Sequence, residues 1–193
     1  MGYFANAGQI LINFAFGAVI ALLVLRVLLQ LAHANFYNPV CQFLYKATNP
    51  VLMPLRKVIP AWRNVDVAAI VLAWLLTALK LWLMYSLAGQ DLGLLGMAVM
   101  ALADLIDFVL MLYFGLILGQ VLLSFITVER SNPIVPLIYQ LTEPLLRPIR
   151  KRLPAFGGLD FSPMVAWLLI MLARVLIAAP LLDLGMRLAQ SAA

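Results

Sequence analysis

The stretch that decides the fold is NPVCQFLYKATNPVLMPLRKVIPAWRNVD, residues 38–66, which returns 94 positions later as NPIVPLIYQLTEPLLRPIRKRLPAFGGLD, residues 132–160. Twelve of the 29 aligned positions are identical, and the alignment needs no gap. Two unrelated stretches of this composition would share about two positions, so the match indicates an internal duplication.

The composition around this repeat is that of a membrane protein. The chain has 193 residues, of which 65% are apolar and 11% charged, and its mean hydropathy is +1.04. A soluble core cannot bury that much apolar surface, so we expect the chain to lie in a bilayer. Four stretches are long and apolar enough to cross about 30 Å of hydrocarbon. They cover residues 9–32, 66–87, 105–127 and 163–184.

These spans predict an all-α membrane protein built from two helix–loop–helix repeats, with short amphipathic, proline-rich helices in the loops. Because each repeat crosses the membrane twice, the two copies should be parallel and related by an approximate two-fold axis along the membrane normal. We assign residues 1–94 to the first repeat and 95–193 to the second. The apolar segment 89–103 is predicted to be a separate helix on the outer surface, with a re-entrant dip as the alternative.

The basic residues predict the orientation of the chain. They concentrate in the two repeat loops, which should therefore face the cytoplasm and leave both termini outside. Six of them form a candidate docking site for lipid headgroups or an acidic partner: Arg56, Lys57, Arg147, Arg150, Lys151 and Arg152. The alternative is that these cations only fix the orientation.

Prolines punctuate both loops. Their spacing predicts two short helices per loop, the second beginning near Pro50 or Pro144, with Thr48 or Thr142 as a nearby cap. Asp66 and Asp160 stand where the following spans begin, so both are predicted to cap a helix N-terminus.

The motif also carries a family resemblance. Thr142-Glu143-Pro144-Leu145-Leu146-Arg147-Pro148-Ile149-Arg150, followed by Asp160-Phe161-Ser162-Pro163, resembles the YggT/YlmG family of bacterial and plastid membrane proteins. In the first copy Ala68-Ala69 replaces the Ser-Pro pair and Met53 replaces an arginine. The resemblance implies a double-repeat, multi-pass protein of the bacterial inner membrane, in which the termini that the basic residues place outside would be periplasmic. It also implies links to osmotic stress, ion balance and the maturation of membrane complexes.

Charged residues inside the spans form a second candidate site. An ionisable side chain in hydrocarbon costs several kcal/mol unless it is paired or hydrated. We expect an intramembrane polar cluster of Lys80, Asp104, Asp107 and Arg174, joined by Thr77 and Gln120, where the repeats meet. It serves either as ion-pair glue between helices or as a proton or cation relay. Arg26 should extend its side chain toward the inner surface.

The sequence offers no chemistry for an enzyme. Its single cysteine, Cys41, excludes an intramolecular disulfide, and we see no nucleophile–base pair, phosphate-binding loop or metal-ligand spacing. We therefore expect no cofactor and no metal site. The favoured function is a scaffold or assembly factor for membrane complexes, and the alternative is a component of a small oligomeric ion channel or transporter. The expected partners are anionic phospholipids, other membrane proteins and further copies of this chain, but not nucleic acid.

Overall fold

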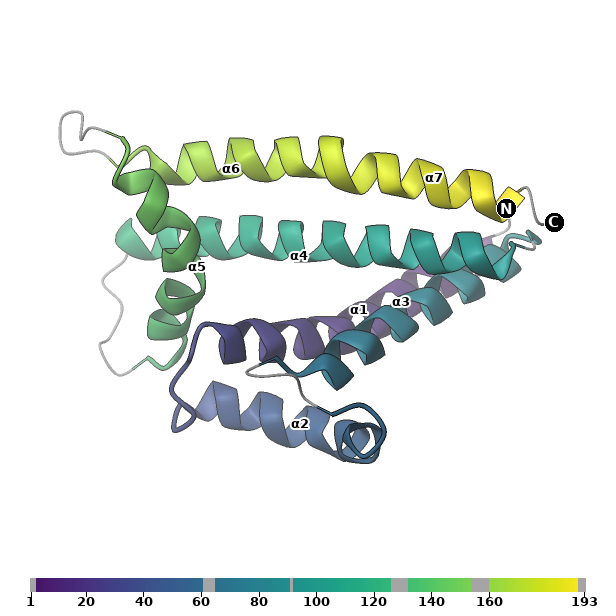
Figure 1. Cartoon of the computed structure of the whole chain (residues 1–193), viewed down its shortest axis with the longest axis horizontal. Helices are drawn as coiled ribbons and strands as arrows, with labels where there is room; N and C mark the ends of the chain where they lie inside the picture. Colours follow the sequence, from purple (N-terminus) through teal and green to yellow (C-terminus); the bar gives the residue numbers. More distant parts are fainter. Residues whose placement is uncertain (1–2, 61–64, 91, 126–131, 154–159, 191–193) are drawn as a thin grey trace.

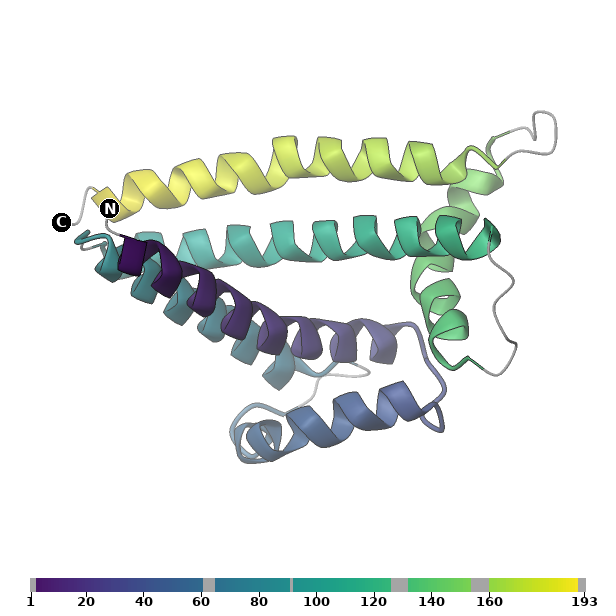
Figure 2. The ribbon, with the colours of Figure 1, turned by 180° about the vertical axis from the view of Figure 1, so that it is seen from behind.

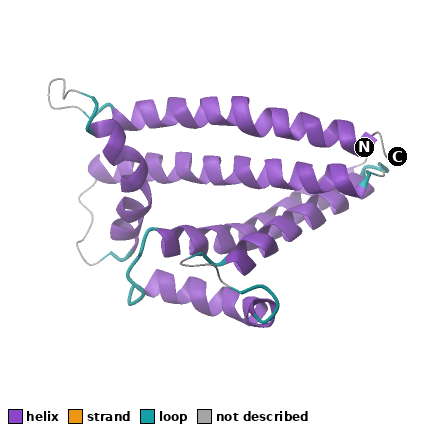
Figure 3. Ribbon diagram, viewed as in Figure 1, coloured by secondary structure: helices purple, strands orange, loops and turns teal. Residues whose placement is uncertain are grey.

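The structure is a computed structural model that describes residues 3–60, 65–90, 92–125, 132–153 and 160–190. These residues form helices and loops, with no strand among them (Figure 3). In chain order the helices are α1 (Tyr3–Leu31), α2 (Pro39–Arg56), α3 (Val67–Leu87), α4 (Leu94–Phe125), α5 (Ile134–Arg150), α6 (Ser162–Ala173), the π-helical turn η1 (Arg174–Ala178) and α7 (Ala179–Gln190).

Four of the helical segments are long and apolar enough to cross a membrane. They cover Asn6–Leu31, Val67–Leu87, Leu94–Phe125 and, as one continuous stretch through η1, Ser162–Gln190. At 1.5 Å per residue the 32 residues of α4 extend about 48 Å, which exceeds the thickness of the hydrocarbon layer. The predicted all-α fold with four membrane-compatible helices is confirmed.

The two repeats pack as two helix pairs that meet at α3 and α4. In Figures 1 and 2, α1 runs beside α3, and α4 runs beside the α6–α7 segment. The core between α1 and α3 consists mainly of small and branched aliphatic side chains, with Leu23, Ala69 and Ala73 nearly inaccessible. The start of α1 and the end of α7 lie at the same end of the bundle, and α5 crosses α4 at the opposite end (Figure 1).

The loop helices differ from the prediction in being single and unbroken. Pro50 and Pro54 lie inside α2, and Pro144 and Pro148 lie inside α5, so the expected division into two short helices is wrong. All four prolines lie on the exposed side of their helix, where water can satisfy the carbonyl groups that proline leaves without a donor. Both helices remain amphipathic, as predicted, with leucines such as Leu52 and Leu146 fully buried.

The segment after α3 also differs from the prediction. The chain turns at Gly89, whose φ of +71° is in the left-handed region that favours glycine. From Leu94 onward it belongs to α4, so the separate surface helix predicted at 89–103 is wrong. Gly96 does not break this helix. A Cβ at Gly96 would lie 2.2 Å from the backbone nitrogen of Ala189, so the glycine allows α4 and α7 to approach closely.

Candidate functional site

A set of polar side chains joins three helices of the first repeat. Arg26 of α1 donates a hydrogen bond from Nη1 to the hydroxyl of Thr48 in α2, and that hydroxyl donates to the carbonyl of Leu44 at 2.6 Å. Arg56, at the end of α2, binds Asp66 at the start of α3, and its Nη1 lies 3.5 Å from Asn49. The Nε of Arg26 lies 3.6 Å from the same carboxylate.

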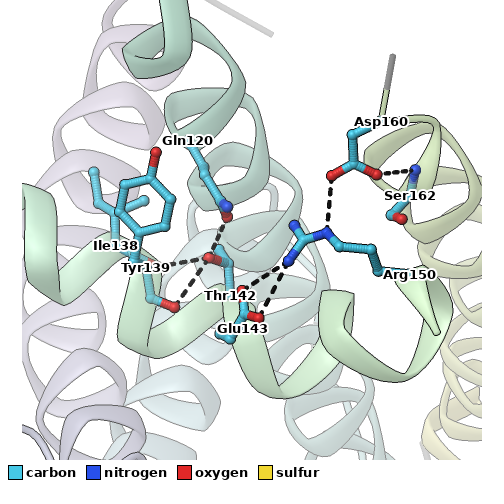
Figure 4. Close-up of polar contacts among 8 residues, drawn as sticks. All are labelled: Gln120, Ile138, Tyr139, Thr142, Glu143, Arg150, Asp160 and Ser162. Atoms are coloured by element: carbon cyan, nitrogen blue, oxygen red, sulfur yellow. Dashed lines mark hydrogen bonds and ion pairs between the residues drawn. The ribbon is translucent and has the colours of Figure 1, made fainter. Parts of the chain in front are cut away.

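The second repeat builds the same set at positions 94 residues later (Figure 4). The hydroxyl of Thr142 is hydrogen bonded to Gln120 of α4 and lies 2.7 Å from the carbonyl of Ile138. Arg150 binds Asp160 at 3.0 Å and Glu143 at 3.2 Å. We call each set of five a polar frame: frame 1 comprises Arg26, Thr48, Asn49, Arg56 and Asp66, and frame 2 comprises Gln120, Thr142, Glu143, Arg150 and Asp160.

The frames close each repeat by tying its loop helix to both spans. The threonine, Thr48 or Thr142, joins the loop helix to the preceding span. The arginine, Arg56 or Arg150, joins the C-terminal end of the loop helix to the aspartate at the start of the following span. Asp66 accepts a hydrogen bond from the backbone N–H of Ala69, so its predicted role as an N-cap of α3 is confirmed. Asp160 accepts from the backbone N–H of Ser162 at 2.9 Å, but the N-cap residue of α6 is Phe161, so the N-cap role predicted for Asp160 is wrong. The geometry that the two frames share therefore serves to hold the fold together.

The electrostatics of the frames agree with this pairing. The hydrogen bond to Asp66 raises the pKa of Arg56 above its ordinary value. Partial burial opposes ionisation of both Arg150 and Asp160. Even so, the contacts with Asp160 and Glu143 raise the pKa of Arg150, and the hydrogen bonds from Ser162 and Arg150 lower the pKa of Asp160. Arg56, Arg150 and Asp160 are therefore charged at neutral pH.

The net charge of the frames is opposite in sign. Frame 1 contains two arginines and one carboxylate, which gives +1, whereas frame 2 contains one arginine and two carboxylates, which gives −1. Two replacements produce the reversal, Arg26 by Gln120 and Asn49 by Glu143. The contact with the threonine and the contact of the arginine with residue 49 or 143 survive these changes, whereas the approach of Arg26 to Asp66 has no counterpart among the described contacts of frame 2.

The six basic residues predicted as a docking site divide into two groups. Arg56 and Arg150 belong to the frames and are engaged within the chain. The other four are exposed and take part in none of the ion pairs within the described ranges: Lys57, Arg147, Lys151 and Arg152. They lie at and just beyond the C-terminal ends of α2 and α5.

The charges predicted inside the spans form two ion pairs, both on α4. Lys80 of α3 approaches Asp104 at 2.6 Å and thereby links the two repeats. Arg174, the first residue of η1, contacts Asp107 through two nitrogens, at 2.6 and 3.0 Å. A cavity of about 400 Å³ beside the second pair is lined by Asp104, Asp107 and Arg174 among apolar residues of α6, η1 and α7.

One residue expected near these charges lies elsewhere. Gln120 belongs to frame 2 and contacts Thr142, so its predicted place in the intramembrane cluster is wrong. Arg26 is only 8% exposed and stacks over the ring of Tyr45 at 4.7 Å, so its side chain is held against α2. Thr48 and Thr142 lie within α2 and α5 rather than at a helix start. The buried guanidinium of Arg26 contacts a hydroxyl, a carboxylate and an aromatic face, and these contacts replace those it would make with water.

The described part of the chain shows no group of three or more His, Cys, Asp or Glu residues that could hold a metal ion. Within the same residues every buried side-chain nitrogen or oxygen has a hydrogen-bond partner. The charged side chains of the described residues discussed above therefore occur as ion pairs or as exposed cations.

These features define a duplicated helical protein whose four long apolar helices suit a membrane and whose two loop helices are fastened by equivalent polar frames. The chain belongs to the CCB3/YggT family, whose model matches it twice, at residues 5–87 and 99–181. The two matches are offset by the same 94 residues as the frames.

Curated relatives align with most of this chain, and the alignments cover most of their own length. The uncharacterized protein YggT of Escherichia coli is 39% identical over 163 residues, which cover 84% of this chain and 85% of the relative. An uncharacterized protein of Pseudomonas aeruginosa is 40% identical over 178 residues, 89% of each chain. A Vibrio alginolyticus protein, named for its place in the proC 3' region, is 38% identical over 178 residues, 89% of this chain and 93% of its own. No solved structure matches.

Proposed function

We propose that this protein is a non-enzymatic scaffold of the bacterial inner membrane that helps membrane complexes to assemble or to stay assembled. It acts through the ends of α2 and α5, which face the cytoplasm, while both termini are periplasmic. Its ligands there are acidic surfaces of other membrane proteins and anionic phospholipids.

This proposal rests on exposed cations that form no ion pair with another described residue and that lie at helix ends held in place by the frames. The apolar faces of α2 and α5 pack on the spans, and the frames hold the end of each helix through Arg56 or Arg150. The neighbouring Lys57, Lys151 and Arg152 are exposed. A cation on a backbone that is held in place can bind an acidic surface without a further loss of backbone conformational entropy.

A cross-linking experiment in cells tests the proposal. A photoreactive amino acid at Val58, which is 80% exposed beside Lys57, should form adducts with a small set of membrane proteins. The adducts should disappear when the four exposed cations are changed to glutamine: Lys57, Arg147, Lys151 and Arg152.

The matched control exchanges each of these lysines for arginine and each arginine for lysine, which preserves the charge. The adducts should survive in this control. Adducts that persist in the glutamine variant would contradict a cationic docking surface.

A second candidate function is a component of an oligomeric ion channel or transporter that contributes to osmotic and ion balance. The cavity beside Asp107 and Arg174 favours it, because π-helical turns such as η1 are frequent at functional sites. The test is cation flux into liposomes that contain the protein, with Asp107→Asn as the variant. Flux that requires Asp107 would support this candidate, and an absence of flux from the unmodified protein would exclude it.

A further inference from the structure

A cavity of about 420 Å³ lies between the end of α1, the following turn and α2. Its polar wall includes the two arginines of frame 1, Arg26 and Arg56, together with His33. Its apolar wall includes Leu29, Phe36 and Leu44. The ring of Tyr45, also in the wall, contacts Phe36 edge-on at 5.3 Å and lies beneath the guanidinium of Arg26.

The charge of this cavity exceeds what the fold requires. In frame 2 the neutral side chain of Gln120 makes the contact that Arg26 makes in frame 1, so the interhelical bond to threonine does not need a cation. The one carboxylate of frame 1, Asp66, serves both arginines and is itself 1% exposed. The cavity therefore presents two guanidinium groups against one buried carboxylate.

The remaining donors of Arg26 suit an oxyanion. A guanidinium has five N–H donors in a planar fork that matches a phosphate or carboxylate. In Arg26, Thr48 engages Nη1 and Asp66 lies near Nε. An anion in the cavity would add charge-assisted hydrogen bonds, which are about twice as strong as neutral ones.

The position of the cavity along α1 favours a lipid as the source of that oxyanion. Arg26 lies five residues before the end of α1, about 7.5 Å along the helix. In a spanning helix this is the boundary between headgroups and acyl chains. The volume of the cavity is several times that of a single phosphate, and its apolar wall suits a glycerol backbone and the start of an acyl chain.

We propose that the cavity between α1 and α2 binds the phosphate group of an anionic phospholipid, with Arg26 and Arg56 as the anion ligands. The site belongs to the first repeat, because frame 2 has the opposite net charge. The site goes beyond the proposed scaffold function, since it uses residues other than the four exposed cations and requires no protein partner.

A binding experiment on the full chain in neutral detergent tests the proposal. The probes are short-chain phosphatidylglycerol, short-chain phosphatidylcholine and inorganic phosphate, and binding is read by native mass spectrometry and by the rise in melting temperature. Phosphatidylglycerol should bind at least about tenfold more tightly than either other probe, which corresponds to about 1.4 kcal/mol.

Two variants locate the site. Arg26→Gln copies the residue of frame 2 and should weaken phosphatidylglycerol binding at least about tenfold. Lys46→Gln removes the same charge from an exposed position outside the cavity, so it should change binding by no more than about twofold. Equal losses in the two variants would overturn the site in favour of general surface attraction.

A third variant guards against a folding defect in Arg26→Gln. Cys41 also lines the cavity, and Cys41→Phe should fill it without changing any charge. This variant should lose binding as Arg26→Gln does. Unchanged binding in Cys41→Phe would overturn the proposal, and so would inorganic phosphate binding as tightly as the lipid, because the site would then accept the free anion.

Discussion

Asp66 and Asp160 occupy equivalent positions in the two repeats, yet they lie in different surroundings. The Asp66 side chain is 1% exposed and approaches both Arg56 and Arg26, whereas the Asp160 side chain is 43% exposed and pairs with Arg150. The same backbone geometry therefore supports a positively charged frame around a buried carboxylate in one repeat and a negatively charged frame with two exposed carboxylates in the other. Duplication has preserved the contacts that close the fold while leaving charge and burial free to diverge.

The largest expected effect is the loss of the buried carboxylate. Asp66→Asn keeps an acceptor for the N-cap of α3 but leaves Arg26 and Arg56 without a counter-charge, and breaking a buried pair in this way costs about 3–5 kcal/mol. The matched Asp160→Asn should cost less than about 1 kcal/mol, because its pair is exposed. Unfolding in mixed micelles measures both. Equal losses would contradict the distinction between the frames.

The contact between the repeats at Lys80 and Asp104 should have the next largest effect. Lys80→Met or Asp104→Leu alone leaves one charge without its partner in a poorly solvated place, at about 3 kcal/mol. The double variant should regain most of that loss, because an apolar pair needs no compensation. A double variant as unstable as the sum of the two single variants would show that the pair does not act as glue. The same cycle on Arg174 and Asp107 tests the contact within the second repeat.

The close approach of α4 and α7 gives a smaller effect. Gly96→Ala places a methyl group against the backbone of Ala189 and should cost about 2 kcal/mol, because the helices must move apart. Gly17 of α1 has open space where a methyl group would stand, so Gly17→Ala should be neutral or slightly stabilising. Melting temperatures in detergent compare the two. An unchanged melting temperature for Gly96→Ala would show that the close packing of α4 against α7 does not contribute to the stability of the protein.

The four long helices and the repeat were predictable because apolar length and a fixed offset are properties of the sequence itself. The continuation of α4 back to Leu94 was not predicted, because a helix of 32 residues, about 48 Å, is longer than the hydrocarbon layer requires and the packing of Gly96 against Ala189 is a property of the fold. Prolines spaced four apart also suggested a break in each loop helix, although their exposed position lets α2 and α5 continue.

The two polar frames could have been predicted from the sequence. Applying the offset of 94 to every polar residue pairs Arg26 with Gln120 and Thr48 with Thr142, and the identical Arg56 and Arg150 stand the same distance from an aspartate. What the offset could not supply is the burial of Asp66. That depends on how Arg26 and the neighbouring helices cover the carboxylate.

The proposed parallel arrangement of the repeats is tested most directly by cysteine accessibility in a Cys41→Ser background. Single cysteines at Lys57 and Lys151 mark the two loop helices, and one at Gln90 marks the turn between the repeats; all three positions are exposed. A membrane-impermeant thiol reagent should label the Gln90 position in intact spheroplasts and the other two only after the membrane is opened. Labelling of the Lys57 and Lys151 positions from opposite sides would contradict two parallel repeats with a shared cytoplasmic face.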